Sequence, residues 1–395
     1  MRDTEVYIVS AVRTPIGNFC GGLSTLKASE MGCVAIREAL DRAKVKPEEV
    51  SEVIIGQALT AGQGQNPARQ AAVDAGIPFS VPSHLINMLC GSGMKSVVSG
   101  CQSIKTGDAD IVVCGGQESM SQAPHIVQMR SGLKMGNTEI VDTMLRDGLT
   151  DAFTNIHMGI TAENVAKKYE ITREEQDKYA EESHIKTVSA QTYGSFKKEL
   201  VPVTVICRGE KKSISQDEFP KPNTNFESLQ KLKPVFIKQG GGTVTAGNAS
   251  GLNDGAAMVV LMSAAVARAR CVKPLARIVA YSQTGCDPQY MGIGPVSAVN
   301  SVLYKAGWQK EEVDLFELNE AFAAQALAVI KELGIDKSKV NVNGGAISIG
   351  HPIGCSGTRI LVTLLYALEK TGGKKGVASL CIGGGMGIAI AVQRD

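Results

Sequence analysis

The sequence contains an internal repeat, which limits the folds open to the chain more than any other feature. Three segments near its start recur near its end in the same order, two of them 263 and 264 residues apart. The matched pairs are residues 40–50 with 303–313, 91–95 with 355–359, and 6–9 with 276–279. Such self-similarity predicts a fold built twice from one α/β unit. The alternative is coincidental patterning in an unduplicated α/β protein.

Short apolar, β-branched runs alternate with helical segments in both copies. The first matched run ends a helix and leads into an expected strand, at 53–56 in one copy and 315–318 in the other. The glycine-rich segment opens an amphipathic helix that leads to a buried strand ending in glycines, at 111–116 and 377–384. This alternation predicts mixed, largely parallel sheets that helices cover on both faces.

The segment between the two copies has a different character. It is rich in Met, Lys and Glu, and we expect a helix over 163–186 that Thr172 caps in part. A strand at 258–262 is expected to return to the first copy. The chain has 395 residues, more than one core usually supports. The predicted domains are an N-terminal half (1–119 and 246–272), an inserted loop domain (120–245) and a C-terminal half (273–395).

Charge, aromatic content and cysteine spacing exclude several function classes. The formal net charge is +2 and aromatics make up 5% of the chain, which argues against a nucleic-acid partner. The ten cysteines are scattered without zinc spacing, so we expect reduced thiols in an intracellular protein. The N-terminus resembles neither a signal peptide nor a transit peptide, and no apolar run reaches the roughly 18 residues of a membrane span. We therefore expect a cytosolic protein without a membrane partner.

A cysteine precedes the first glycine-rich turn. Cys90 lies directly before Gly91-Ser92-Gly93, which opens a helix. The positive end of a helix dipole favours a thiolate, so this position favours a nucleophile. The alternative reading is a structural cysteine, and Cys355, within the second glycine turn, is a competing nucleophile.

Three more segments place reactive residue types at loops and strand ends. His351 lies between Gly350 and Pro352 on a rigid loop ahead of the second glycine turn, where it could accept a thiol proton. Cys381 leaves a buried strand into a run of glycines whose N–H groups could bind an oxyanion. Asn319 closes another buried strand. A hydrogen-bonded loop histidine, a strand-end cysteine and a helix-capping asparagine are the alternative readings.

Together these segments resemble the thiolase family over nearly the whole chain. The shared motifs are Cys90-Gly-Ser-Gly, Asn319-Glu-Ala-Phe, Gly350-His-Pro-x-Gly-x-Ser-Gly and Cys381-x-Gly-Gly-Gly. The resemblance implies a duplicated five-layered αβαβα fold, two similar halves with mixed sheets and an inserted loop domain. It is nearest to the biosynthetic, cytosolic branch that acts on acetoacetyl-CoA.

The resemblance also implies a role for each motif residue. Cys90 takes the acyl group as a thioester, and His351 accepts its proton. Cys381 acts as acid and base on the second acetyl-CoA. His351 and a water held by Asn319 bind the enolate oxygen, while the N–H groups of Cys90 and Gly383 hold the thioester oxygen. The implied reaction is the ping-pong condensation of two acetyl-CoA to acetoacetyl-CoA and CoA, and its reverse, without a metal or redox cofactor.

Substrate contacts are carried over from the same resemblance. Lys221 and Thr224 are expected to contact the nucleotide part of CoA, and Ser250 the pantetheine arm. Further residues are expected to line the acyl and pantetheine pocket: His157, Met158, Phe236, Ala246, Met291, Ala321 and Phe322. A homotetramer is also implied. Three alternatives remain open, namely a degradative 3-ketoacyl-CoA thiolase of broader chain length, a non-catalytic acyl-CoA or lipid-binding protein, and a ketoacyl synthase acting on carrier-protein substrates.

Overall fold

The structure, a computed structural model, describes residues 5–207 and 209–395. The elements of the N-terminal half are β1 (Val6–Arg13), β2 (Gly17–Asn18), α1 (Ala28–Ala43), β3 (Glu52–Gly56), α2 (Pro67–Asp74), β4 (Ser83–Ile86), α3 (Ser92–Thr106), β5 (Ile111–Ser119), β10 (Asn253–Ser263) and α7 (Ala264–Ala269). Those of the C-terminal half are β11 (Ala276–Gly285), α8 (Gly294–Ala306), β12 (Leu315–Leu318), α9 (Ala323–Leu333), α10 (Ala346–Ile349), α11 (Ile353–Thr371), β13 (Lys375–Ile382) and β14 (Met386–Gln393).

The strands of the two halves follow the same order. In the N-terminal half the order is β1-β10-β5-β3-β4, and in the C-terminal half it is β11-β14-β13-β12. Val340 forms a parallel bridge beside β12, in the place that β4 takes beside β3. The register shifts at Val9 in β1 and again at Val279 in β11, within the matched segments. The duplication predicted from the sequence is therefore confirmed in three dimensions.

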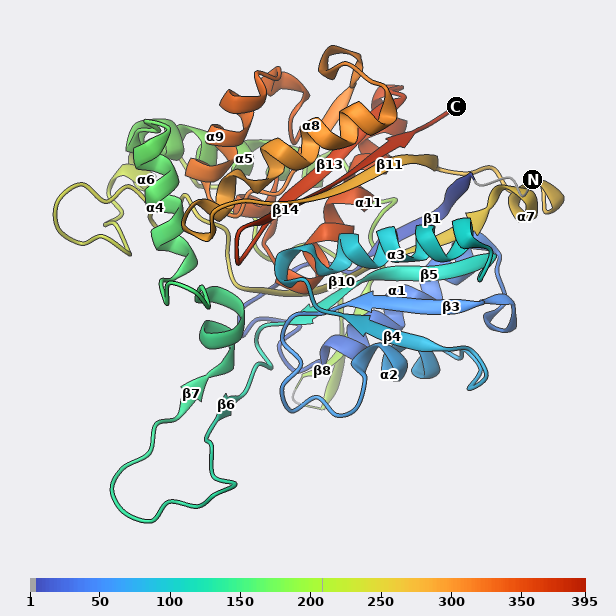
Figure 1. Ribbon diagram of the computed structural model, residues 1–395, viewed down its shortest axis with the longest axis horizontal. Coiled ribbons are helices and arrows are strands. Elements are labelled where there is room, and N and C mark those ends of the chain that lie inside the picture. The colour runs from blue at the N-terminus through green and yellow to red at the C-terminus, as the bar shows by residue number, and fades with distance from the viewer. Residues whose placement is uncertain (1–4, 208) are drawn as a thin grey trace.

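The strands of each half form a layer of their own, the two layers are joined at one point, and the halves share one central helical layer. Tyr7 and Ile8 of β1 pair with Arg277 and Ala276 of β11, which joins both sets of strands within the described residues. Helices α1 and α2 cover the outer face of the N-terminal strands, α3 and α11 lie together in the middle, and α8 and α9 cover the C-terminal strands (Figure 1). The five-layered αβαβα fold is confirmed.

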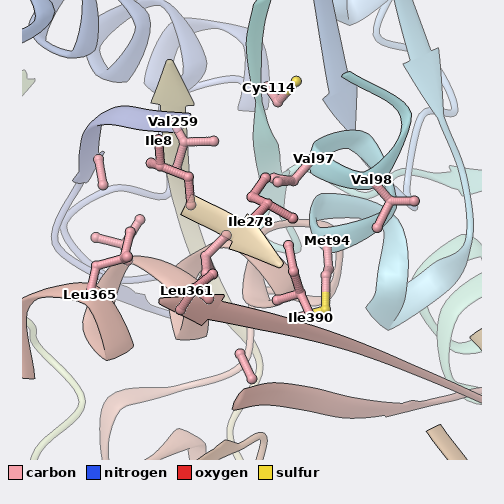
Figure 2. Close-up of a cluster of buried hydrophobic side chains, with 14 of the residues drawn as sticks. Ile8, Met94, Val97, Val98, Cys114, Val259, Ile278, Leu361, Leu365 and Ile390 are labelled. Carbon is pink, nitrogen blue, oxygen red and sulfur yellow. The ribbon is translucent and has the colours of Figure 1, made fainter. Parts of the chain in front are cut away.

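The main core lies around the central pair of helices. Met94, Val97 and Val98 of α3 lie in one cluster with strand residues of both halves and with Leu361 and Leu365 of α11, and Met94 points toward Ile390 (Figure 2). All five side chains are almost fully excluded from solvent. The two helices also end alike, because Gly107 and Gly372 adopt the left-handed conformation that closes each helix. Packing each helix N-terminus against the other half brings the two glycine turns together.

The sheet differs from the expectation in one respect. Its mixed character is confirmed, but most neighbouring strands are antiparallel; among the strands in the described residues, β3 runs parallel to β4 and β5, and β12 to β13, while the remaining pairs are antiparallel. The reason is that β10 and β14 return through each half against both of their neighbours. The strand expected at 258–262 is part of β10, and its return to the first half is confirmed.

The inserted segment contains short elements around one long helix. They are β6 (His125–Ile126), β7 (Val141–Asp142), a π-helical turn (Met144–Leu149), α4 (Met158–Lys168), α5 (Arg173–Thr192), β8 (Val203–Cys207), β9 (Glu210–Ile214) and α6 (Phe226–Gln230). The prediction of one helix over 163–186 is wrong, since residues 169–172 separate α4 from α5. The predicted cap at Thr172 is confirmed, because Thr172 caps α5 together with Glu175. The loop that carries β6 and β7 projects away from the body (Figure 1). The predicted domain boundaries stay a prediction.

Candidate active site

One cavity of about 390 Å³ brings the predicted reactive side chains together. Cys90 comes from the turn before α3, His351 from the loop before α11, and Cys381 from the end of β13. The remaining wall comes from loops of the inserted segment and from residues that follow β12. Eight of the ten predicted substrate contacts line it: His157, Met158, Phe236, Ala246, Ser250, Met291, Ala321 and Phe322.

Cys90 lies in a tight turn. The residue before it, Leu89, has a φ of 49°, a left-handed conformation that is uncommon outside glycine. Ser92 stabilises the turn, because its hydroxyl accepts from the Met88 N–H and donates to the Leu89 carbonyl. Gly91 is pressed against the other half, since a Cβ there would come within 2.4 Å of Ile382 Cδ1. The turn therefore fixes the thiol at the junction of the two halves.

The resting state of Cys90 differs from the sequence-based expectation of a favoured thiolate. Burial raises the pKa of the Cys90 thiol to about 11, although hydrogen bonds from the backbone N–H groups of Gly383 and Cys90 act in the opposite direction. Desolvation of a charged sulfur in an apolar wall outweighs the helix terminus. The thiol is therefore protonated near neutral pH, and a nucleophilic role requires a base at hand.

His351 is held as a neutral imidazole in one tautomer. The Ser356 hydroxyl donates to the Pro352 carbonyl, so its oxygen is left to accept a hydrogen bond from His351 Nδ1 at 2.6 Å. This assignment leaves a lone pair on Nε2, to which Asn319 Nδ2 donates at 3.4 Å. Burial, with a smaller contribution from Arg359, lowers the pKa of His351 to about 3. The ring is thus neutral, and the acceptor nitrogen that faces Asn319 is Nε2.

Asn319 is buried behind the cavity. Its side-chain amide donates to His351, while its Oδ1 has no hydrogen-bond partner in the structure. The helix-capping reading is wrong, because α9 begins only after Phe322. An unpaired buried carbonyl is uncommon, and a water O–H is the kind of donor that can pair with it.

Cys381 is also buried, in an apolar cluster with Met158, Met291 and Phe322. Burial and then the neighbouring Cys90 raise the pKa of the Cys381 thiol well above its ordinary value. Gly383, two residues further, borders a second hollow that Met158 shares with the main cavity. Two protonated thiols therefore share one wall of the cavity.

An aromatic pair also lines the cavity. The rings of His157 and Phe236 stack with centroids 4.7 Å apart. His157 Nδ1 accepts from the Gly159 N–H and caps α4, and burial lowers the pKa of His157. Ser250 is fixed by its own N–H, which donates to the Ala321 carbonyl. The wall that meets a substrate is thus apolar and firmly held.

Lys221 and Thr224 lie outside this cavity. They line a separate hollow of about 320 Å³ together with His184 and Tyr193. Lys221 Nζ lies 5.1 Å from the centroid of the Phe219 ring, and that ring packs against Gly251 beside Ser250. The structure therefore does not bring the two residues to the reactive thiols, and their contact with a nucleotide stays a prediction.

Sequence reasoning missed three residues that hold the site in place. Ser356 orients the His351 ring, and Asn253 accepts from the His351 backbone N–H at 2.9 Å. Glu118 accepts from backbone N–H groups on both sides of the site. Only the short spacing of Ser356 from His351 could have signalled a contact, since the other two lie far away in sequence.

Metal-binding clusters and membrane-spanning helices are both absent from the part of the chain that the structure describes. Residues 5–207 and 209–395 contain no group of three or more His, Cys, Asp or Glu side chains arranged to hold a metal ion. None of the helices in these ranges has the length and apolar character needed to cross a membrane.

Known proteins resemble this chain over almost its full length. Residues 6–265 match the family model "Thiolase, N-terminal domain" and residues 272–394 match "Thiolase, C-terminal domain". The cytosolic acetyl-CoA acetyltransferase of Mus musculus is 58% identical over 98% of each chain, and an acetyl-CoA acetyltransferase of Chromobacterium violaceum is 57% identical over 99% of this chain and 100% of its own.

Two solved structures show the same fold. The acetyl-CoA acetyltransferase of Bacillus anthracis superposes with a TM-score of 0.97, and human mitochondrial 3-ketoacyl-CoA thiolase with 0.96. Each is 46% identical in sequence and covers 99% of both chains. With its repeated halves, its four motifs and these matches, the chain belongs to the thiolase family.

Proposed function

We propose that this enzyme is an acetyl-CoA C-acetyltransferase, which condenses two acetyl-CoA to acetoacetyl-CoA and CoA and also runs the reverse thiolysis. The observation that carries the proposal is the single apolar cavity in which Cys90, His351 and Cys381 meet. Relatives that match the whole chain at 57–58% identity are named acetyl-CoA acetyltransferases. The reaction class is acyl transfer through a covalent thioester.

In the first half-reaction Cys90 attacks the thioester carbonyl of acetyl-CoA. The lone pair on His351 Nε2 takes the thiol proton as the sulfur–carbon bond forms, because the thiol alone is protonated at neutral pH. The N–H groups of Gly383 and Cys90 already reach the Cys90 sulfur, so they are near enough to stabilise the oxyanion on the adjacent carbonyl. CoA leaves as a thiolate and takes a proton from Cys381.

In the second half-reaction the Cys381 thiolate removes a proton from the methyl group of another acetyl-CoA. The enolate oxygen is stabilised by His351, which now carries the Cys90 proton, and by a water held on Asn319. The nucleophilic carbon attacks the acetyl-Cys90 thioester, and a carbon–carbon bond forms as the Cys90 sulfur leaves. The Cys90 sulfur regains its proton from His351, so both thiols return to the resting state.

The reacting groups lie in a small, apolar cavity that favours short acyl chains. Met158, Met291 and Phe322 pack in one cluster with Cys381, so bulky side chains occupy space beside this thiol. A displaced methionine could admit longer chains, since its side chain is adaptable. Chain length is therefore what separates this proposal from a degradative 3-ketoacyl-CoA thiolase.

The partners and setting follow from the same proposal. The substrates are acetyl-CoA, acetoacetyl-CoA and CoA. The enzyme acts in the cytosol, in line with the relative that is named cytosolic. No metal or redox cofactor takes part. The enzyme is a homotetramer, and the projecting loop offers apolar side chains for such an assembly: Ile126, Val127, Met129, Leu133, Met135 and Ile140 are exposed. Light scattering coupled to gel filtration measures the oligomeric state.

The deciding experiment is a thiolysis assay with purified, reduced enzyme and CoA. The proposal expects rapid cleavage of acetoacetyl-CoA and a kcat/KM for 3-ketooctanoyl-CoA lower by about 100-fold or more. Equal rates on both substrates would indicate the degradative, broad-range enzyme. Folded enzyme that cleaves neither substrate would indicate a binding protein.

A further inference from the structure

Glu118 is a buried carboxylate that connects the two catalytic loops. It lies near the end of β5, and no part of it is exposed. Its Oε2 accepts from the Ala58 N–H and from the Gly354 N–H, both at 2.9 Å, and its Oε1 accepts from the Leu59 N–H at 3.2 Å. Three backbone N–H donors thus fix the position of the Glu118 carboxyl group.

The hydrogen bonds from Ala58 and Leu59 to Glu118 hold a loop that packs against the nucleophile. Ala58 and Leu59 pack in one apolar cluster against Cys90. The Ala58 carbonyl also accepts from Asn87 Nδ2 at 3.2 Å, and Asn87 Oδ1 in turn accepts from the Leu89 N–H at 3.0 Å. Glu118 therefore fixes the loop that supports the strained turn at Leu89.

The third hydrogen bond, from Gly354 to Glu118, holds the start of the helix that follows the base. Gly354 lies in the first turn of α11, three residues after His351, and α11 has no side-chain cap of its own. Glu118 supplies that cap from the other half of the molecule, where the carboxylate also complements the positive end of the helix. No larger residue fits at Gly354, since a Cβ there would come within 2.7 Å of Glu118 Oε2.

We propose, on the basis of the acetyltransferase function above, that Glu118 is a positioning residue that sets the distance between Cys90 and His351. It touches neither substrate nor thiol. Its effect runs through Ala58 and Gly354, whose backbone positions it ties together. Burial raises the pKa of Glu118 to about 8, although the hydrogen bonds from Ala58, Leu59 and Gly354 act in the opposite direction. The carboxyl group is therefore mostly protonated at pH 7, and its oxygen lone pairs still accept from the N–H donors.

The test compares Glu118→Asp with Glu118→Gln. Aspartate keeps the carboxyl group but is too short to reach both loops. Glutamine keeps the length, and its amide oxygen can accept from Ala58 and Gly354 together, as Oε2 does, although its NH₂ group cannot accept the longer bond from Leu59. We expect kcat for thiolysis to fall at least about 30-fold in the Asp variant, with KM values within about threefold, because displacements near 1 Å can cost about 100-fold in rate. The Gln variant should stay within about fivefold of wild type.

A stability control and a second readout separate positioning from folding. Val112→Ala removes buried side-chain volume from the same strand and should lower the melting temperature while leaving kcat unchanged. Alkylation of Cys90 by iodoacetamide, which requires no thiolase turnover, should slow at least about fivefold in the Asp variant and recover in the Gln variant. Wild-type kcat and alkylation rate in the Asp variant would overturn the proposal, as would an equal loss of kcat in Val112→Ala. An inactive wild-type enzyme would instead refute the acetyltransferase function, and the alkylation rates would still decide the role of Glu118.

Discussion

The two halves of the molecule share a backbone plan but differ in what they place at the ends of their strands. The parallel pairs Ile55–Gly115 and Leu318–Ser379 are equivalent in the two halves, 263 and 264 residues apart. Counting on from them, Gln117 of the N-terminal half corresponds to Cys381 of the C-terminal half. Gln117 is buried and donates to Gln57, whereas Cys381 lines the cavity. One copy thus uses the position for structure and the other for chemistry.

The next position shows the same division in a different form. Glu118 corresponds to Ile382, and each side chain crosses to the helix N-terminus of the opposite half. Ile382 makes an apolar contact with Gly91 beside the nucleophile, while Glu118 makes hydrogen bonds to Gly354 beside the base. The two halves thus present equivalent helix N-termini, one next to a thiol and the other next to an imidazole. The predictions below test this division of labour.

The largest effect is expected at the nucleophile of the N-terminal half. Cys90→Ala should lower kcat for acetoacetyl-CoA thiolysis by about 10⁵-fold or more, because the covalent route is removed. Cys101→Ala, which removes a buried core thiol from the same helix, is the matched control and should stay within about threefold of wild type. An active Cys90→Ala enzyme would mean that the nucleophile lies in the other half.

The proton-transfer thiol of the C-terminal half should behave differently. Cys381→Ala should lower the overall rate by about 10² to 10⁴-fold, the range of general acid–base catalysis. The same variant should still become acetylated at Cys90 by acetyl-CoA, which stopped-flow or mass measurements can follow. Cys355→Ala is the control on this side, since Cys355 is buried in the main core. Loss of acetylation in Cys381→Ala would erase the distinction between the two thiols.

Asn319 should have a smaller effect on the same half-reaction. Asn319→Ala removes the amide that donates to His351 and the unpaired carbonyl oxygen beside it. Loss of one oxyanion-stabilising group costs about 10² to 10³-fold. Exchange of the methyl protons of acetyl-CoA with D₂O should fall by the same factor, because the enolate is the species affected. Unchanged exchange would place Asn319 outside the reaction.

The pH dependence of Cys90 alkylation distinguishes a buried thiol from an activated thiolate. Burial raises the pKa of Cys90 to about 11, so the thiolate fraction should rise about tenfold per pH unit. The rate of inactivation by iodoacetamide should therefore increase about 100-fold between pH 7 and 9 without a plateau. Cys381 and His351 line the same cavity as the thiol, and the more distant Glu118 also raises the pKa of Cys90 through its charge. A plateau of the alkylation rate below pH 8 would show that the helix terminus lowers the pKa of Cys90 more than burial raises it.

The smallest effect is expected at Ser356. Ser356→Ala removes the hydroxyl that accepts from His351 Nδ1 and so frees the ring to change its tautomer. A hydrogen bond of this kind contributes about 0.5–1.5 kcal/mol, which corresponds to a loss of kcat of about two- to tenfold. Ser356→Thr keeps the hydroxyl and serves as the control. A loss above about 100-fold would mean that Ser356 takes part in the proton transfer directly.

The duplicated fold and the positions of the three reactive side chains could be predicted from the sequence, because the repeat and the motifs are local sequence patterns. The offsets of 263 and 264 residues set equivalent helices and strands side by side, and Cys90, His351 and Cys381 lie directly at their ends. Convergence of these three side chains then follows from a twofold arrangement of two similar units.

The remaining features depend on partners that the sequence does not bring together. Glu118 and Gly354 are 236 residues apart, and the partner atom is a backbone N–H that every residue except proline possesses. The prediction that Cys90 is a thiolate was wrong for a related reason. A helix N-terminus can be read from glycines and hydroxyls, but the depth of burial that raises the pKa emerges only from tertiary packing.

The most direct test of the account is to find where the acetyl group resides during turnover. Wild-type enzyme is mixed with acetyl-CoA in the absence of added CoA, quenched in acid, digested and analysed by mass spectrometry. The account predicts one acetyl group on the peptide that contains Cys90, and its transfer back to CoA when CoA is added. An acetyl group on Cys381 or Cys355, or none during active turnover, would contradict the assignment of the nucleophile to the N-terminal half.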